Sequence, residues 1–133
     1  MFRRLFSRNR GPLNAAPSPR VKHYASPSGY AYEYWHEGRR AYRSRTDSGT
    51  EFVFRIAADR KGGPTVSVFL STGVLQVWER NHAREFSGAE RYAIAKMALF
   101  QAFDEHAGPA EMGAAVLVSA SDLEAIVARL NIE

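Results

Sequence analysis

The 133-residue sequence contains no cysteine, no long apolar run and no acidic residue before Glu33. The lack of cysteine excludes disulfides, thiolate catalysis, iron–sulfur clusters and cysteine zinc sites, and it fits a reducing compartment. No apolar run approaches the roughly 18 residues that a membrane-spanning helix requires. We therefore predict that the protein is not an integral membrane protein.

Catalytic signatures are also missing from the chain. It has no G-x-S-x-G nucleophile motif, no P-loop and no dinucleotide-binding G-x-G-x-x-G. The stretch 36–40, HEGRR, differs from a zinc-protease motif because Arg40 replaces the second histidine ligand, and the segment has the pattern of a hairpin rather than a helix. We predict a protein without catalytic residues, metal site or cofactor, and hence not an enzyme.

The net charge of +4 comes from the first 22 residues, which carry six basic residues and no acid. Residues 23–133 hold twelve basic and fourteen acidic residues, so the rest of the chain is slightly negative. Glycine and proline between residues 11 and 19 break any helix there. We therefore predict a basic, disordered tail over 1–22, followed by a single domain over 23–133. The candidate tail contacts, to a membrane surface or a nucleic acid, are Arg3, Arg4, Arg8 and Arg10.

From residue 30 onward, apolar and polar side chains alternate with period two, as in strands. Turn sequences at 37–38, 47–49, 59–64 and 72–73 separate the predicted strands, and 74–79 is the last of these strands. The pattern predicts an antiparallel β-meander of about five strands within residues 30–79.

The remainder of the chain predicts helices. Ser87 and Glu90 form a capping box that opens a helix over 88–106, and a second box at Ser121–Glu124 opens a short helix over 122–130. Residues 114–118 have the pattern of a short strand. The first helix has apolar side chains on two sides, so the C-terminal segment either packs on it or forms a dimer contact. The fold class predicted is α+β.

One cluster exceeds the background: tyrosine, tryptophan and arginine are concentrated near residues 30–45. Such residues pack on exposed strands, form hot spots of protein interfaces, and bind single-stranded nucleic acid by stacking and phosphate contact. All three interpretations stay open. The candidate partner-binding residues are Tyr32, Tyr34, Trp35, Arg39, Arg40, Tyr42, Arg43 and Arg45.

These observations favour a small non-enzymatic protein-interaction module, such as a regulator, an immunity-type protein, a mobile-element inhibitor or an assembly subunit. The alternative is a nucleic-acid-binding accessory protein that uses the Arg/Tyr-rich hairpin and the basic tail. A homodimer is also compatible with the pattern. Usage rich in alanine, arginine and glycine favours a bacterial cytoplasm, whereas the arginine-rich, acid-free start is also typical of a mitochondrial presequence leading to the matrix.

Overall fold

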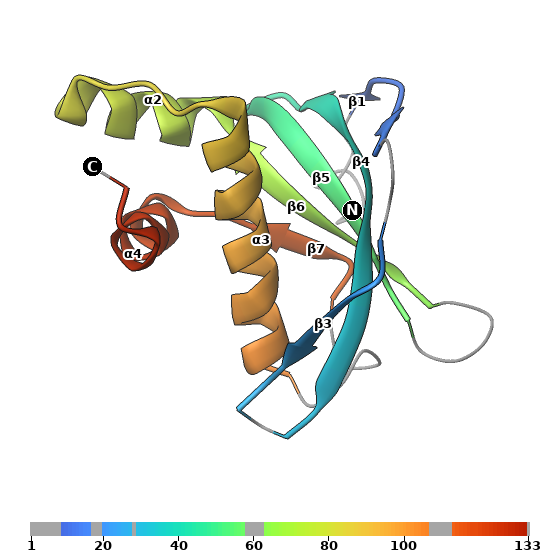
Figure 1. Ribbon diagram of the computed structural model, residues 1–133. Coiled ribbons are helices and arrows are strands. Elements are labelled where there is room, and N and C mark those ends of the chain that lie inside the picture. The colour runs from blue at the N-terminus through green and yellow to red at the C-terminus, as the bar shows by residue number, and fades with distance from the viewer. Residues whose placement is uncertain (1–8, 17–19, 28, 58–62, 107–112, 133) are drawn as a thin grey trace.

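A computed structural model describes residues 9–16, 20–27, 29–57, 63–106 and 113–132. Figure 1 shows one twisted sheet with helices packed against one of its faces. The predicted α+β class, an antiparallel sheet packed by C-terminal helices, is confirmed. The predicted tail residues Arg3, Arg4 and Arg8 lie outside the described residues.

The described residues form a seven-stranded sheet. Its centre is an antiparallel run of three long strands, β4 (Ala31–Arg43), β5 (Ser48–Ile56) and β6 (Thr65–Ser71). The short strand β7 (Ala115–Leu117) pairs in parallel with β6 at one edge. The predicted strand within residues 114–118 is thus present, although the chain reaches it only after two helices.

Strand β4 replaces two predicted strands. The turn predicted at Glu37-Gly38 is wrong, because the register with β5 shifts between His36 and Gly38 and marks a β-bulge inside one continuous strand. The extra residue reverses the alternation of side chains beyond it. Even-numbered side chains before the bulge, such as Tyr34, therefore face the helices, whereas even-numbered ones after it, such as Tyr42, face the opposite side.

The segment predicted as a disordered tail is partly paired with the outer edge of β4. The strands β1 (Asn9–Arg10), β2 (Asn14–Ala15) and β3 (Lys22–Ala25) all run antiparallel to β4. A side chain at Gly38 would collide with the backbone oxygen of Asn14, so glycine at the bulge lets β2 approach. Prolines interrupt this edge segment, which limits further strand pairing on that side.

The strand predicted over 74–79 is a helix, α2 (Thr72–His82). Ser71 caps it by accepting a hydrogen bond from the Val74 amide at 3.2 Å. Leu75 and Trp78 are the buried residues of this helix, and their spacing of three places them on one helical face. The apolar residues of 74–79, at positions 74, 75, 77 and 78, have the spacing of a helical face, and Leu75 and Trp78 pack in the core from that face.

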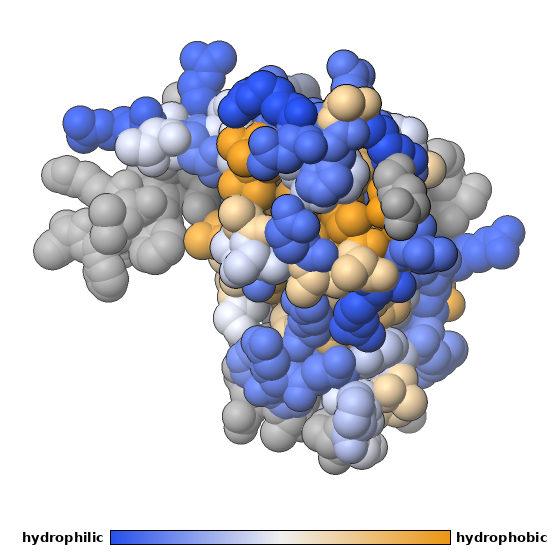
Figure 2. Space-filling view, turned by 90° about the vertical axis from the view of Figure 1, so that its left-hand side faces the viewer, coloured by the Kyte–Doolittle hydropathy of each residue, from blue (hydrophilic) through white to orange (hydrophobic). Residues whose placement is uncertain are grey.

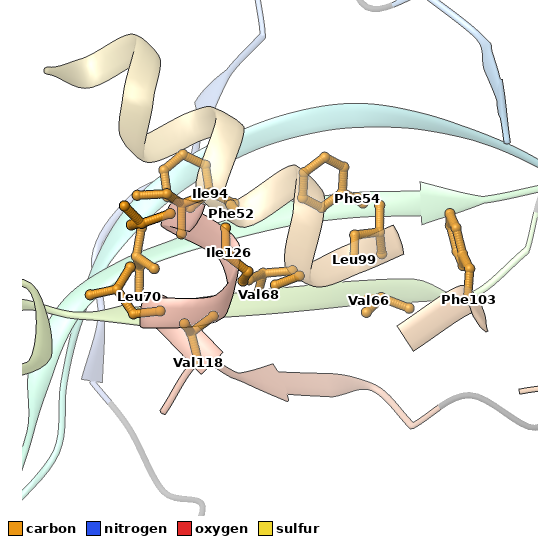
Figure 3. Close-up of a cluster of buried hydrophobic side chains, with 14 of the residues drawn as sticks. Phe52, Phe54, Val66, Val68, Leu70, Ile94, Leu99, Phe103, Val118 and Ile126 are labelled. Atoms are coloured by element: carbon orange, nitrogen blue, oxygen red, sulfur yellow. The ribbon is translucent and has the colours of Figure 1, made fainter. Parts of the chain in front are cut away.

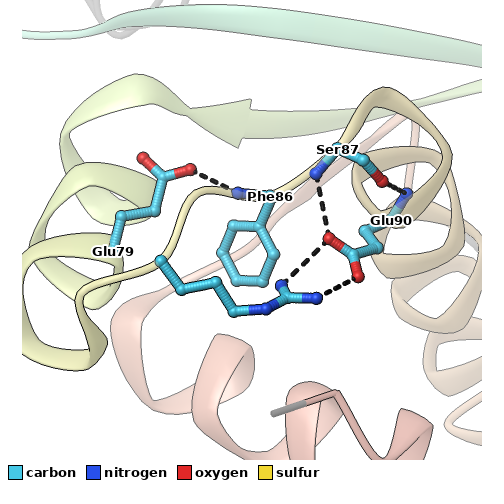
Figure 4. Close-up of polar contacts among 5 residues, drawn as sticks. Glu79, Phe86, Ser87 and Glu90 are labelled. Atoms are coloured by element: carbon cyan, nitrogen blue, oxygen red, sulfur yellow. Dashed lines mark hydrogen bonds and ion pairs between the residues drawn. The ribbon is translucent and has the colours of Figure 1, made fainter.

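The turn between α2 and α3 (Gly88–Asp104) is held by polar contacts (Figure 4). The Phe86 amide donates to Glu79 Oε2 at 2.8 Å, and the predicted capping box of Ser87 and Glu90 is confirmed. The Arg84 guanidinium donates to both carboxylate oxygens of Glu90 at 3.0 and 2.6 Å. The hydrogen bonds from Arg84 above all, and then those with Ser87, lower the pKa of Glu90 to about 2.

The last helix, α4 (Ala120–Leu130), begins two residues earlier than predicted. Its N-cap is Ser119 rather than Ser121, and Ser119 forms the reciprocal capping box with Asp122. An aspartate at the third helical position reaches back to the Ser119 amide just as a glutamate would. Figure 1 shows α4 beside α3, on the same face of the sheet.

The main hydrophobic core lies between the sheet and these helices (Figure 3). Side chains from β5 and β6, including Phe52, Phe54 and Val68, meet Leu99 and Phe103 from α3. Phe103 is fully buried and stacks on Tyr32 with ring centroids 4.0 Å apart. The core fixes the helices on one face, so the other face of the sheet is left without helical cover.

Candidate partner-binding site

The predicted aromatic residues do not form a surface platform. Tyr32 and Tyr34 are 0% and 2% exposed, and both rings pack against Phe103 of α3. Burial raises the pKa of Tyr34 to about 12, as expected for a phenol that is enclosed. These rings stabilise the fold from inside the core and are not presented for stacking on a nucleobase.

Tyr42 is also buried, but on the opposite face of the sheet. Its ring meets the Phe69 ring edge-on at 5.1 Å, and its hydroxyl donates to Asp47 Oδ2 at 2.8 Å. Trp35 is half-buried on that face, opposite Arg55 of β5. Arg55 binds Glu37 at 2.7 Å, and this hydrogen bond is the main reason that the pKa of Glu37 is lowered.

A buried carboxylate organises the face that the helices leave uncovered. Glu51 is 0% exposed and accepts hydrogen bonds from the Ser67 hydroxyl at 2.6 Å and the Arg40 guanidinium at 3.0 and 3.3 Å. Arg10 forms a further ion pair with Glu51 at 3.1 Å and lies over the Phe69 ring. Burial alone would raise the pKa of Glu51, but the Arg40 and Ser67 hydrogen bonds and the nearby arginine charges hold the pKa below its ordinary value.

This network has two consequences for the predicted site. Arg40 serves an internal ion pair, so it is not a free surface cation. Arg10, predicted as a tail contact, instead ties strand β1 to the body of the sheet. Sequence reasoning missed Glu51 because a glutamate in an alternating strand has the same local pattern whether it is buried or exposed.

Three arginines, Arg10, Arg43 and Arg45, line one open depression at the end of the sheet. It lies between the turn that joins β4 to β5 and the start of α2, where Thr72 and Gly73 complete the wall. Arg43 and Arg45 are exposed, and their side chains make no ion pair or hydrogen bond with any other residue that the structure describes. We call this group of residues the basic depression.

Among the described residues, Asp47 is the single carboxylate that lines the basic depression, and both of its oxygens already accept hydrogen bonds. Tyr42 and Ser71 donate hydroxyl hydrogen bonds to its two oxygens at 2.8 Å each. The start of α2 adds the partial positive charge of a helix N-terminus. Its first turn holds no acidic residue that would offset this charge. The basic depression therefore combines an excess of positive charge with the side-chain donors of Arg43 and Arg45, which have no acceptor in the described part of the chain.

Other chemistry-bearing groups are dispersed. No group of three or more histidine, aspartate or glutamate side chains within the described ranges is placed to hold a metal ion. His36, from the zinc-protease-like stretch, lies in β4 among the rings of Phe54 and Tyr92. Burial lowers its pKa, so it is neutral at neutral pH. Arg39 is exposed on the helix-facing side of β4 and outside the basic depression.

The surface seen from the side of α2 and α4 is mostly hydrophilic, with small separate hydrophobic patches (Figure 2). None of the helices in the described part of the chain is both long and apolar enough to cross a membrane. No protein-family model, curated protein or solved structure matches the chain.

Proposed function

We propose that this protein is a small protein-interaction module, and that its basic depression binds an acidic surface of a partner protein. The observation that carries the proposal is the convergence of Arg43 and Arg45, whose side-chain donors have no acceptor among the described residues, with Arg10, which already pairs with Glu51. Arginine is enriched in protein interfaces and binds carboxylates through two parallel hydrogen bonds. We place this module in a bacterial cytoplasm, where a chain without cysteine is at no disadvantage.

The shape of the depression supports binding rather than catalysis. It is wide and open, so it does not exclude water from a bound molecule. The described residues that line it include no paired acid and base, because the one carboxylate among them, Asp47, is held by two hydroxyls. An open basic surface suits recognition of a carboxylate-rich partner, with fast association under electrostatic attraction.

A nucleic acid is the competing ligand, since arginines bind phosphate as readily as carboxylate. The burial of Tyr32, Tyr34 and Tyr42 argues against it, because single-stranded nucleic-acid sites rely on exposed aromatic rings. Contact with phosphates alone would remain, and such binding weakens steeply with salt.

A pull-down from source-cell lysate separates the two. The full chain, tagged at its C-terminus, is compared with the double variant Arg43→Ser/Arg45→Ser and the control Arg80→Ser/Arg129→Ser. The control removes the same charge from exposed positions in α2 and α4. We expect one protein partner that survives nuclease treatment, is lost with the first variant and is kept by the control. Recovery that nuclease abolishes favours the nucleic-acid alternative, and equal loss in both variants refutes the basic depression as the site.

A further inference from the structure

Within the described residues, no further strand pairs with the second edge of the sheet, at β7. The Ser67 amide donates to the Ala114 carbonyl, and the Val118 amide donates to the Phe69 carbonyl. Alternate residues of the segment 114–118 therefore bond to β6. The N–H and C=O groups of Ala115 and Leu117 consequently point away from the sheet. No hydrogen bond joins these groups to another residue in the described part of the chain.

The side chains at this edge favour pairing. Residues 113–118, GAAVLV, hold no charge and no proline, and Leu117 is 57% exposed, the highest value among the large hydrophobic residues described. Exposed edges are normally blocked by charges, proline or a covering segment. The opposite edge has such cover from the N-terminal strands with their prolines, whereas β7 has none of these devices in its sequence.

We propose that β7 pairs with β7 of a second copy of this chain, in antiparallel orientation about a twofold axis at Val116. This register places Leu117 opposite the partner's Ala115, so the outward groups of each strand exchange two hydrogen bonds per opposed pair. It also sets a large side chain beside a small one on the face without helices. The outward groups of Ala115 and Leu117 all find partners in this register, and the result is one continuous sheet across both copies.

Added salt should affect this dimer contact in the opposite direction to partner binding at the basic depression. The residues that line a small pocket beside β7 include two acids, Glu105 and Asp122, and one histidine, His106. In the pair, the acidic side chains of both copies flank the new ladder and repel each other, so added salt strengthens the dimer. Binding of an acidic partner to the basic depression is weakened by salt, which makes the two contacts separable in one titration.

The dimer is tested on the full chain by sedimentation velocity over a range of protein and salt concentrations. The short ladder predicts a weak dimer, with a dissociation constant between about 1 µM and 1 mM. Leu117→Lys sets like charges close together across the axis and is expected to weaken the dimer at least about tenfold. The matched control Val77→Lys changes another exposed hydrophobic residue, on α2, and leaves the dimer intact.

Disulfide trapping tests the register of the two β7 strands. The chain has no native cysteine, so a single introduced cysteine can cross-link only to the same position of a second copy. Val116 lies opposite the partner's Val116 in a pair of the closer, non-hydrogen-bonded kind, within the span of a disulfide. Val116→Cys should therefore cross-link to a dimer on mild oxidation, much faster than Glu124→Cys, which places the thiol at an exposed position on α4.

Three results would overturn the proposal. The first is a chain that stays monomeric at millimolar concentration and high salt. The second is a dimer that Leu117→Lys does not weaken or Val116→Cys does not trap, since that dimer uses another surface. The third is slow hydrogen exchange of the Leu117 amide in dilute monomer, which would show that another segment of the same chain covers the edge.

Discussion

Replacing Glu51 with glutamine tests the buried network that joins β1, β4 and β6. The carboxylate is fully buried, whereas the Arg40 and Arg10 side chains are 25% and 43% exposed. Removing one partner of a buried ion pair costs about 3–5 kcal/mol. Both arginines retain some hydration, so we expect the lower end, about 3 kcal/mol. For a chain of 133 residues this corresponds to a fall in Tm of about 10 °C.

The assay is urea unfolding at neutral pH, followed by circular dichroism, with Glu33→Gln as the matched control. Glu33 pairs with His23 at 3.2 Å, but their side chains are 54% and 67% exposed. Exposed pairs contribute at most about 1 kcal/mol, so the control should be nearly neutral. A loss below about 1 kcal/mol for Glu51→Gln would refute the claim that this carboxylate is buried and paired.

The same network predicts how stability depends on pH. The pKa of Glu51 is lowered in the folded protein, so its contribution is present above the ordinary glutamate pKa of 4.5 and is lost as pH falls through the folded value. The urea midpoint of the wild-type chain should therefore fall as pH drops below about 4.5. Glu51→Gln should show a shallower fall, and parallel curves for the two proteins would contradict this assignment.

Three further substitutions test the fold. Phe103→Ala removes a fully buried ring from the core and should cost about 3–5 kcal/mol in urea unfolding. Ser119→Ala should lower the free energy of unfolding by about 1 kcal/mol through loss of the α4 cap, whereas Ser121→Ala should be nearly neutral. The reverse order would show that Ser121 is the cap, as the sequence predicted. Gly38→Ala should lower the free energy of unfolding by about 1–2 kcal/mol, because the added methyl group pushes β2 away from β4. The Ala16 amide donates to the Glu37 carbonyl across this contact. Unchanged hydrogen exchange of that amide would refute this reason.

The parts of the fold that were predictable are those that local chemistry determines. Ser87 and Glu90 satisfy each other within one turn, so the start of α3 was visible in the sequence. The alternation of Phe52, Phe54 and Ile56 likewise marked a strand with one buried side. The segment 74–79 was assigned to a strand from its β-branched and aromatic residues, although the spacing of its apolar residues and the Ser71 cap both favour the helix.

The candidate site was less predictable because it depends on contacts between distant segments. The bulge at Glu37 moves Tyr42 and Arg40 to the other face, and no side-chain pattern distinguishes a bulge from a turn at Glu-Gly. Tyr32 and Tyr34 are buried because α3 packs on them, through contacts with Phe103 some 70 residues away along the chain. Arg43 and Arg45 were identified from composition, but their convergence with Arg10 depends on backbone pairing of β1.

The central claim is that the basic depression is the surface that binds a protein partner. Hydrogen exchange by mass spectrometry on the full chain, with and without the protein captured in the pull-down, tests it most directly. We predict that exchange slows upon binding in residues 43–49 and at the start of α2, near Thr72 and Gly73. Slowing confined to other surfaces, with residues 43–49 unchanged, would contradict the account.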